Sequence, residues 1–432
     1  MSDAPDSVLG HRLGFLNERA RVACLVCARE ARGPSLFSGC AVCGVAAPLT
    51  LVYEPAPRRD LGLADAITEA RQHFAPFSPT ARAFSRPPTP LDPAPRLSRG
   101  VYLKNEAFSL TSSHKDRYNA VAARVARLLG SRGMVASSTG NHGVSAAAHA
   151  AAAGLPSVVF CHPEAPAGLL RAIGAVRGVA AQLEPDAQRA ALVALVEDGW
   201  FPATSMDPTL SGAANPFGAE GYKATAYETV EQLGTMPDAV FIPTAGGDTY
   251  YGITKGFAEV AELSGAPMPV VFALQPEDAN SLSRSLTAGR QVTLERPASI
   301  ALSIADPRTG RHAMVAVARW GGHSLDVAEA AIRAAIADLA GIGIYADPAS
   351  AAALAGYRQA IETGAIAPHA KAVLLLTSSG FKWPDAMAAV FPADALRSVD
   401  ELQHRLAASA GSTERVSSLK GLTNHSRRWT DS

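Results

Sequence analysis

The sequence predicts an α/β protein in which parallel β-strands alternate with α-helices. Short apolar runs typical of buried strands are followed by alanine-rich stretches with a helical period, and this alternation is typical of parallel sheets covered by helices on both faces. With 432 residues, 48% of them hydrophobic, the chain can bury a core in one large or two ordinary domains. The predicted strands are Ser157–Cys161, Ala239–Pro243, Val270–Leu274 and Ala372–Thr377. The predicted helices are Tyr118–Leu129, Val144–Ala153, Ala187–Val196, Thr225–Leu233 and Val327–Leu339.

The charge pattern and hydropathy argue against two classes of partner. The formal net charge is zero, and no basic block with interleaved aromatic residues is present, so nucleic acid is not an expected partner. No apolar run reaches the length of a transmembrane helix, so we expect no membrane association. The N-terminus, MSDAPDSVLGHR, lacks the layout of a signal peptide, and we expect a cytoplasmic protein.

Four of the five cysteines form two closely spaced pairs near the N-terminus. Cys24 and Cys27 are followed by Cys40 and Cys43, and glycines flank the second pair. Two Cys-x-x-Cys pairs at this separation can supply four thiolates to one tetrahedral zinc, whose role would be structural because protein fills every ligand position. The alternatives are four reduced cysteines or two redox pairs. Cys161 ends an apolar run and is predicted to be a buried small hydrophobe.

The chain divides by composition into four predicted segments. A zinc ribbon covers residues 20–50, and a Pro- and Arg-rich arm with a helix near Leu63–His73 covers residues 51–99. A catalytic body follows over residues 100–400, and the polar, basic residues 411–432 are predicted to form a flexible tail.

The stretch Leu103–Gly143 contains the lysine on which the functional prediction depends. Lys115 lies between His114 and Asp116, just before a predicted helix. A lysine in the first turn of a helix is usually solvated. A lysine that attacks a carbonyl must instead be held and partly desolvated, so that its amine becomes neutral and nucleophilic. The neighbouring motifs decide between these two interpretations.

Two further motifs follow predicted strands. The segment Ile242–Thr249 ends in Ala-Gly-Gly-Asp-Thr, where glycines let backbone N–H groups turn toward an anion at the start of a helix. Alone such a motif is usually a turn, but it directly follows an apolar strand here. Asp248 is an unusual neighbour for an anion, so its side chain should point away from the loop or cap the helix. The segment Leu376–Lys382 is the second motif, at the end of the last strand.

In this order the motifs resemble the fold-type II pyridoxal-phosphate enzymes, and the threonine synthase branch most closely. The matching segments are Arg86–Leu91, Lys104-Asn105-Glu106, Ser113-His114-Lys115-Asp116-Arg117, Ser138-Thr139-Gly140-Asn141, Ile242–Thr249 and Leu376–Lys382. The resemblance implies a tryptophan-synthase-β-like fold of two domains with the cofactor in the cleft, in which a small domain of about residues 125–220 is inserted in the large one. Some relatives in this branch carry a zinc ribbon ahead of the catalytic body.

The resemblance also implies residue roles. Lys115 would bind pyridoxal 5'-phosphate covalently and act as the base at the substrate α-carbon. Asn141 would bind the ring hydroxyl, and Thr377 would meet the ring nitrogen, with Ser378 as the near alternative. The phosphate would lie on the loop formed by Ala245, Gly246, Gly247, Asp248 and Thr249. The substrate would contact Ser137, Ser138, Thr139, His142 and His114.

The sequence departs from the family pattern at three positions. Gly218 stands where threonine synthases carry an arginine that holds the substrate phosphate, Tyr222 replaces a glutamine, and His114 replaces an aromatic residue. His114 has two interpretations, simple packing or a proton donor to a leaving group.

Three functions therefore stay open. They are a threonine-synthase-like lyase, a dehydratase, ammonia-lyase or β-replacement synthase, and a non-catalytic cofactor-binding homologue. We expect a small amino-acid substrate and allow for a homodimer.

Overall fold

The structure is a computed structural model. It describes residues 20–31, 36–53, 60–74, 87–138, 140–163, 165–391, 395, 401–402 and 404–405. The chain forms two compact units, Met1–Met387 and Ala388–Ser432, and all strands and site residues discussed below lie in the first. Thr139 and Arg86, which the sequence placed in motifs, lie outside the described residues, and so does the predicted tail over residues 411–432. Within the described part, no helix is long and apolar enough to cross a membrane.

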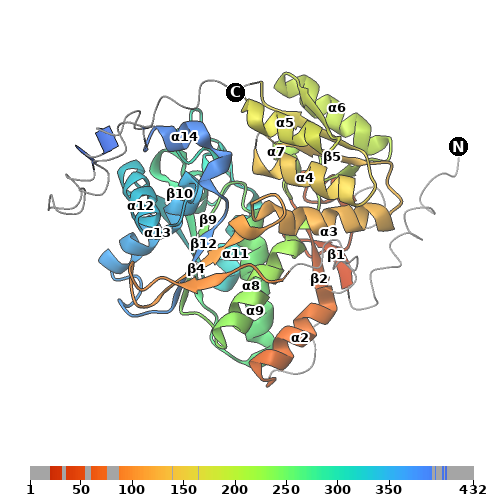
Figure 1. Ribbon diagram of the computed structural model, residues 1–432. Helices are drawn as coiled ribbons and strands as arrows, with labels where there is room; N and C mark the ends of the chain where they lie inside the picture. Colours follow the sequence, from red (N-terminus) through yellow and green to blue (C-terminus); the bar gives the residue numbers. More distant parts are fainter. Residues whose placement is uncertain are drawn as a thin grey trace, which may run out of the picture. The chain divides into compact units, whose positions relative to one another are not determined.

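The elements alternate along the chain as the sequence predicted (Figure 1). The strands are β1 (Ala20–Cys24), β2 (Leu49–Tyr53), β3 (Leu91–Pro93), β4 (Val101–Asn105), β5 (Met134–Ser137), β6 (Ser157–Cys161), β7 (Val179–Gln182), β8 (Phe201–Pro202), β9 (Ala239–Pro243), β10 (Val270–Pro276), β11 (His323–Val327) and β12 (Ala372–Leu376). The α-helices are α2 (Leu63–Phe74), α3 (Lys115–Leu128), α4 (Asn141–Ala152), α5 (Ala167–Ala175), α6 (Pro185–Glu197), α7 (Pro208–Ser211), α8 (Lys223–Leu233), α9 (Asp248–Ser264), α10 (Ser281–Ala288), α11 (Arg311–Trp320), α12 (Glu329–Gly341), α13 (Pro348–Glu362) and α14 (Pro384–Ala388). Short 3-10 helices are η3 (Glu106–Phe108), η4 (Gly218–Tyr222), η5 (Glu277–Ala279), η6 (Leu302–Ile304) and η7 (Gly380–Lys382).

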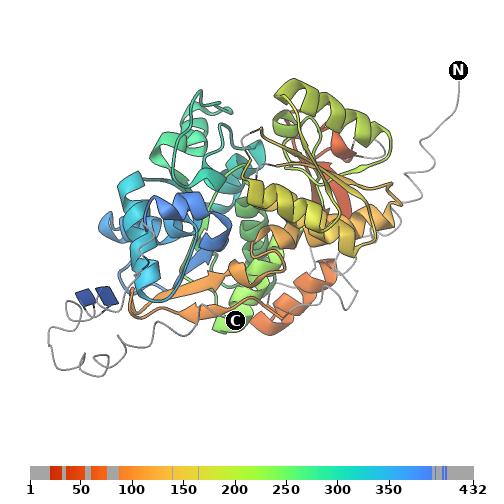
Figure 2. The ribbon, with the colours of Figure 1, turned by 45° about the horizontal axis from the view of Figure 1, so that its top comes forward.

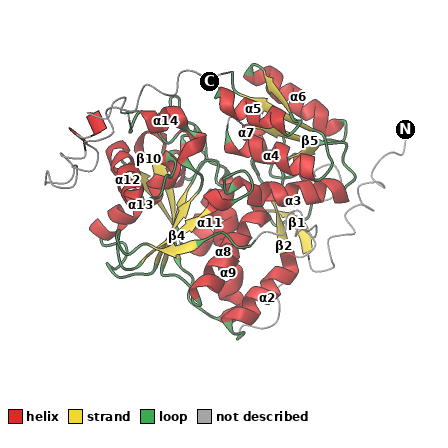
Figure 3. Cartoon of the chain, viewed as in Figure 1, coloured by secondary structure: helices red, strands yellow, loops and turns green. Residues whose placement is uncertain are grey.

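A six-stranded sheet forms the larger layer. Its order is β11-β10-β9-β12-β4-β3, and every neighbouring pair is parallel except the short edge strand β3, which runs antiparallel to β4. β9 and β12 are buried along their whole length, as expected for central strands with both faces covered. Helix α13 packs across β9, β10, β11 and β12, and α9 packs against β9. Figure 3 shows the strands enclosed between helices.

A second, four-stranded sheet is formed by residues 134–202 and is parallel throughout. Its order is β7-β6-β5-β8. The yellow and yellow-green helices that cover this sheet lie at the upper right of Figure 2. Alternate residues of β6 point to opposite faces: Val159 and Cys161 pack under α4 and α5, whereas Phe160 packs with Leu192 of α6. Cys161 is thus the buried small hydrophobe that the sequence predicted. All four strands lie within residues 125–220, and the inserted small domain stays a prediction.

The cysteine pairs lie at the end of a two-stranded antiparallel sheet of β1 and β2, which docks on the catalytic body. The Thr50 hydroxyl lies 2.8 Å from the hydroxyl of Tyr251 on α9, and the Tyr53 hydroxyl donates to Glu220 at 2.7 Å. Lys255 of α9 donates to the Leu51 carbonyl at 2.7 Å. The sheet therefore contacts the helix whose first residues form part of the candidate site.

The predicted fold class and two of the predicted strands are confirmed. The class is α/β with parallel sheets, and β6 and β9 have the predicted bounds. The bounds of the predicted helices differ from those of α3, α4, α6, α8 and α12 by up to three residues. Val327, predicted as the start of a helix, is the last residue of strand β11, and α12 begins at Glu329. The apolar period of α12 extends into the preceding strand, so periodicity alone misplaces the boundary.

Candidate functional site

A cavity of about 330 Å³ lies where loops follow the carboxyl ends of β5, β9 and β12. Open parallel sheets place ligand sites at this edge. It brings together most of the predicted site residues, namely His114, Lys115, Ser137, Ser138, Asn141, His142, Ala245, Gly246, Asp248, Thr249 and Thr377. Gly247 does not line the cavity but shapes the loop beside it, and Thr139 lies outside the described residues.

Lys115 is the first residue of α3 and faces this cavity. Its amine lies 5.9 Å from the centre of the Tyr222 ring. Burial lowers the pKa of Lys115 below its usual value, and the carboxylates of Asp248 and Asp306 only partly oppose this effect. A lowered pKa increases the neutral fraction of the amine, which is what a nucleophile or a base needs.

The residue that follows Lys115 fixes the start of α3. The Asp116 carboxylate accepts hydrogen bonds from the backbone N–H of Thr111 at 2.6 Å, from the Thr111 hydroxyl at 2.8 Å and from Ser145 at 2.7 Å. His149 adds a contact at 3.2 Å. Although burial raises the pKa of Asp116, these contacts, led by His149, lower it below its usual value overall. Asp116 is thus an ionised anchor between α3 and α4.

Arg117 supplies a second anchor. Its guanidinium makes paired contacts to Glu106 at 2.7 and 2.8 Å and to Glu228 at 2.7 and 2.6 Å. Lys104 contacts Glu228 as well, at 2.8 Å. The Lys-Asn-Glu and Lys-Asp-Arg motifs therefore meet in one buried ion network, which holds Lys115 without touching the cavity.

The glycine loop joins β9 to α9, as the sequence predicted. Gly247 has a φ of +108°, and a Cβ built there would lie 2.7 Å from the Cβ of Ala313, so this position requires glycine. The loop ends at the N-terminus of a 17-residue helix, where unpaired backbone N–H groups and the helix dipole attract an anion.

Asp248 turns its carboxylate away from its own loop. It accepts from the Ser205 hydroxyl at 2.7 Å and from the Met206 backbone N–H at 2.9 Å. The His312 ring lies 3.8 Å from the same carboxylate. The Asp248 carboxylate therefore binds the segment after β8, while the Asp248 backbone N–H remains in the glycine loop.

His114 is held by both ring nitrogens. Nδ1 lies 3.1 Å from the Thr377 carbonyl, which can only accept, so Nδ1 carries the proton. Nε2 lies 3.1 Å from the Thr249 hydroxyl, which therefore donates to it. Burial, with Lys115 nearby, keeps the pKa of His114 well below its usual value. The His114 ring is neutral, forms a hydrogen bond at each nitrogen and stacks on Tyr222. These contacts favour a packing role for His114 over a role as proton donor.

The Ser-rich loop ends at the N-terminus of α4, where Asn141 is the first helical residue. The Oδ1 atom of Asn141 is buried and has no hydrogen-bond partner. Nε2 of His142 donates to the Ala203 carbonyl at 2.7 Å, and burial lowers the pKa of His142 to about 4. The Ser138 hydroxyl accepts from the Gly140 backbone at 3.2 Å. This helix start offers backbone N–H groups to a carboxylate, whereas the ring proton of His142 is already donated to Ala203.

Thr377 lies at the end of β12 and lines the cavity, whereas the neighbouring Ser378 does not. The Thr377 hydroxyl is 3.2 Å from that of Ser350, which in turn donates to Asp347 at 2.5 Å. Burial raises the pKa of Asp347 to about 6. A hydroxyl, and not a carboxylate, is thus the group that the strand end presents to the cavity.

Several residues that line the cavity carried no sequence motif. They are Tyr118, Ser205, Leu210, Ser211, Ser303, Ile304, Asp306, Pro307 and Trp383. Ser205, Asp306, Pro307 and Trp383 belong to irregular segments between elements, where neither periodicity nor spacing marks a residue. Asp306 follows the short helix η6, and its neighbour Pro307 was the only local indication of a turn.

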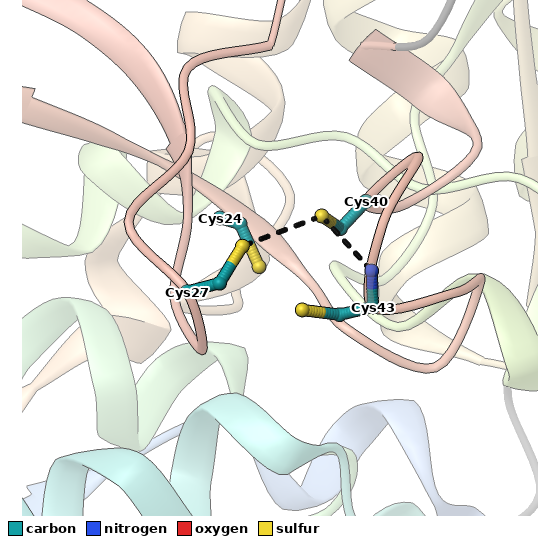
Figure 4. Close-up of side chains that lie close together, drawn as sticks. All are labelled: Cys24, Cys27, Cys40 and Cys43. Carbon is teal, nitrogen blue, oxygen red and sulfur yellow. Dashed lines mark hydrogen bonds between the residues drawn. The ribbon is translucent and has the colours of Figure 1, made fainter.

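The four N-terminal cysteines form the second candidate site (Figure 4). Their sulfurs all lie within 4.8 Å of one another, and the sulfurs of Cys27 and Cys40 are 3.7 Å apart. A tetrahedral zinc with Zn–S bonds of about 2.3 Å separates its sulfurs by about 3.8 Å. Backbone N–H groups of Val42 and Cys43 also point at the Cys40 sulfur, at 3.4 and 3.3 Å. The donor set therefore fits a zinc ion.

Comparison with known proteins identifies the family. Residues 84–378 match the family model described as pyridoxal-phosphate dependent enzyme. The chain belongs to this family, as its fold and its buried lysine indicated.

Individual relatives narrow the group. The chain is 33% identical over 330 residues to the threonine synthase of Halalkalibacterium halodurans, covering 73% of this chain and 90% of that protein. It is 31% identical over 305 residues to that of Mycobacterium tuberculosis, covering 69% and 82%. It is thus a pyridoxal-phosphate-dependent lyase of the threonine synthase-like group.

Solved structures share the fold. A processed threonine deaminase isoform 2 from Solanum lycopersicum aligns with a TM-score of 0.62 at 21% identity, covering 78% of this chain and 96% of that one. Maize serine racemase aligns with a TM-score of 0.60 at 18% identity, covering 79% and 98%.

The cavity fits the cofactor of this family. Asn141 has an orphaned buried oxygen, and Ala245 and Gly246 of the glycine loop line the cavity next to the N-terminus of α9. Lys115 lines the same cavity. A phosphorylated aromatic aldehyde needs this combination of an amine, an anion cradle and a ring contact.

Proposed function

We propose that this protein catalyses elimination or replacement at the β- or γ-carbon of a small amino acid whose side chain carries no phosphate. The observation that carries the proposal is the packing around Gly218. A Cβ at this position would lie 2.2 Å from Cζ of Tyr118, whose hydroxyl is fixed by donation to the Thr204 carbonyl. The Tyr118 ring thus occupies the space that a side chain at 218 would need.

The charges along the cavity support the same proposal. Among the described residues that line it, positive charge could come only from Lys115 and the two histidines. Burial lowers the pKa of His114 and His142 far enough to keep both rings neutral at neutral pH. A phosphorylated side chain would therefore enter a site that offers it no arginine and no charged histidine.

The cofactor would be held by Lys115, Asn141, the glycine loop and Thr377. When bound, it would supply an electron sink for negative charge that develops at the substrate α-carbon. A hydroxyl at Thr377 does not protonate the ring nitrogen as a carboxylic acid would, and this favours elimination and replacement over transamination.

The protein's own groups would perform the remaining tasks. The start of α4, with Ser138 and Asn141, would orient the substrate carboxylate through backbone N–H groups and the helix dipole. Lys115, with its lowered pKa, would take the proton from the α-carbon. Trp383 and Leu210, which line the cavity, would exclude water from the reacting carbon.

A second candidate is the threonine synthase reaction on O-phosphohomoserine. The relatives at 33% and 31% identity that carry this name favour it. It would require the substrate phosphate to be bound without an arginine at position 218.

A spectroscopic assay tests the proposal. Purified protein reconstituted with cofactor should change its visible absorption with serine, threonine or another unphosphorylated amino acid, and should release ammonia or a replacement product. Release of inorganic phosphate from O-phosphohomoserine, with no response to unphosphorylated amino acids, would replace the proposal with the second candidate. A bound cofactor that responds to no amino acid would indicate a non-catalytic homologue.

A further inference from the structure

Two carboxylates, one of them at the end of the glycine loop, and a buried tyrosine hydroxyl belong to the wall of the cavity around Lys115. Asp248 and Asp306 both act on the charge of Lys115, and Tyr222 lies against the same lysine. All three residues line the cavity. A substrate held by its carboxylate at α4 and by its amine near Lys115 would extend its side chain toward this wall.

Asp306 is the less occupied of the two carboxylates, because the contact described for it is the one with the Gly246 N–H. Asp248 is already occupied by Ser205 and Met206, at 2.7 and 2.9 Å. Asp306 lies at the edge of the glycine loop, with one carboxylate oxygen 3.9 Å from a Cβ built on Gly246. Burial, together with Asp248, raises the pKa of Asp306 to about 6, although Lys115 and the Gly246 N–H oppose the shift. The group is therefore mainly ionised at neutral pH.

Tyr222 provides the independent observation. Tyr222 is 1% exposed and lines the cavity, and its hydroxyl makes no hydrogen bond of normal geometry, with only the Thr249 hydroxyl acting weakly on it. A buried hydroxyl without a partner is costly unless a ligand or water satisfies it. Because burial raises the pKa of Tyr222 well above its usual value, the hydroxyl stays protonated and can both donate and accept.

The same groups determine which charge on the substrate side chain the cavity would favour. With the cofactor phosphate on the glycine loop, the site would hold that anion beside Asp248 and Asp306. An anionic substrate side chain would be repelled, a neutral one tolerated and a cationic one attracted.

We propose that the cavity selects an amino acid whose side chain ends in a cationic amine, with the Asp306 carboxylate accepting from that amine and the Tyr222 hydroxyl as its second polar contact. This inference rests on the proposed function and narrows it to small diamino acids. In the elimination, the Cα–H and Cβ–N bonds break and the Cα–Cβ double bond forms. Lys115 takes the α-proton, and the side-chain nitrogen leaves as ammonia. The resulting enamine tautomerises to an imine, and one water hydrolyses it to a 2-oxo acid and a second ammonia.

A charge series on a constant carbon skeleton tests the inference. The holoenzyme at saturating cofactor is titrated with 2,3-diaminopropionate, serine and phosphoserine, and then with 2,4-diaminobutyrate, homoserine and O-phosphohomoserine. The concentration that gives half of the absorbance change is measured for each, together with released ammonia and phosphate. We expect the diamino acid to bind at least tenfold more tightly than the hydroxy acid, and the phosphorylated acid to bind most weakly.

Matched variants test whether the preference for diamino acids comes from the contact with Asp306. Asp306→Asn keeps the shape of the side chain, and should reduce the preference for the diamino acid to about twofold or less while serine binding changes little. Tyr222→Phe should weaken the diamino acid while retaining part of the preference. Asp338→Asn, on an exposed helix surface, should behave as the parent protein. Because Asp306 lies beside the glycine loop, cofactor affinity is measured for each variant before the titrations.

The outcomes separate this inference from the proposed function. Tighter binding of the hydroxy acid than of the diamino acid would overturn the inference and leave the proposed function standing. An unchanged preference in Asp306→Asn would also overturn it. Reaction with only the phosphorylated member of either set would overturn both, and so would the absence of any response in the two series.

Discussion

At the scale of single residues, Gly218 and Tyr118 form a complementary pair. The small residue and the ring occupy one space, since a Cβ at 218 would approach the ring to between 2.2 and 2.5 Å. An arginine at 218 and a tyrosine at 118 in this arrangement exclude one another. The glycine at 218 thus leaves room for the Tyr118 ring, which lines the cavity.

Gly218→Ala tests this packing. The added methyl group must displace a buried ring that is tied to the Thr204 carbonyl, so we expect a loss of roughly 1–3 kcal/mol in the free energy of unfolding. Urea denaturation followed by circular dichroism measures it.

Gly168→Ala is the matched control. It adds a methyl group to the exposed helix α5, where a Cβ would meet nothing within 4 Å. Helix propensity should make this variant about 0.5–1 kcal/mol more stable than the parent. Equal stability changes in the two variants would show that the space beside Gly218 is not filled by Tyr118.

At the scale of elements, the start of α3 is positioned by ions that never touch the cavity. Arg117 joins η3 and α8 through Glu106 and Glu228, and Asp116 joins α3 to α4 through Ser145. These charged residues beside Lys115 are therefore structural, and they would fix the position of Lys115.

Glu228→Gln should destabilise the fold in a pH-dependent way. Despite its burial, contacts led by Arg117 lower the pKa of Glu228 to about 2 from 4.5 in the unfolded chain. The stabilising contribution is therefore fully present above pH 4.5 and is lost as the pH falls toward 2. We expect a loss of roughly 3 kcal/mol at pH 7, shrinking as the pH falls below 4.5.

Glu231→Gln is the matched control on the same helix. Glu231 pairs with Arg71, but the two side chains are 50% and 43% exposed, so the loss should stay below about 1 kcal/mol. Denaturation series at pH 7 and pH 4 measure both variants. A pH-independent loss in Glu228→Gln would contradict the ion network.

The ribbon is the second element with a testable role. Cys24→Ser removes one of four sulfur ligands, and the zinc content should fall well below about one ion per chain. Cofactor binding should survive, since the residues that would hold it belong to other elements. Elemental analysis measures the metal and visible absorption the cofactor. The control Cys161→Ala changes a cysteine outside the cluster and should retain its zinc. Unchanged zinc in Cys24→Ser would reject the site.

At the scale of the whole molecule, strand–helix alternation predicted the class, because buried parallel strands are continuous apolar runs that a sequence shows directly. Strands β7 and β8 were not predicted, because they lack such a run. β7 is largely exposed and β8 spans only Phe201–Pro202, so neither gives an apolar run of useful length.

The residues of the candidate site likewise fall into those that sequence motifs located and those that they did not. Lys115, the glycine loop and the start of α4 follow regular elements, and their motifs gave their positions in advance. Asp306, Ser205 and Tyr222 reach the cavity from irregular segments and a 3-10 helix, and only the folded chain brings them to Lys115. Substrate selection, for which we propose Asp306 and Tyr222, was therefore the part that the sequence left open.

The central claim is that Lys115 carries the cofactor. Its most direct test is to reduce the reconstituted protein with borohydride, which fixes the cofactor to its lysine, and to identify the modified peptide by mass spectrometry. We predict modification at Lys115 and its loss in Lys115→Ala, while Lys371→Ala, at an exposed position, keeps it. Modification of a different lysine in the parent protein, or undiminished turnover by Lys115→Ala, would contradict the account.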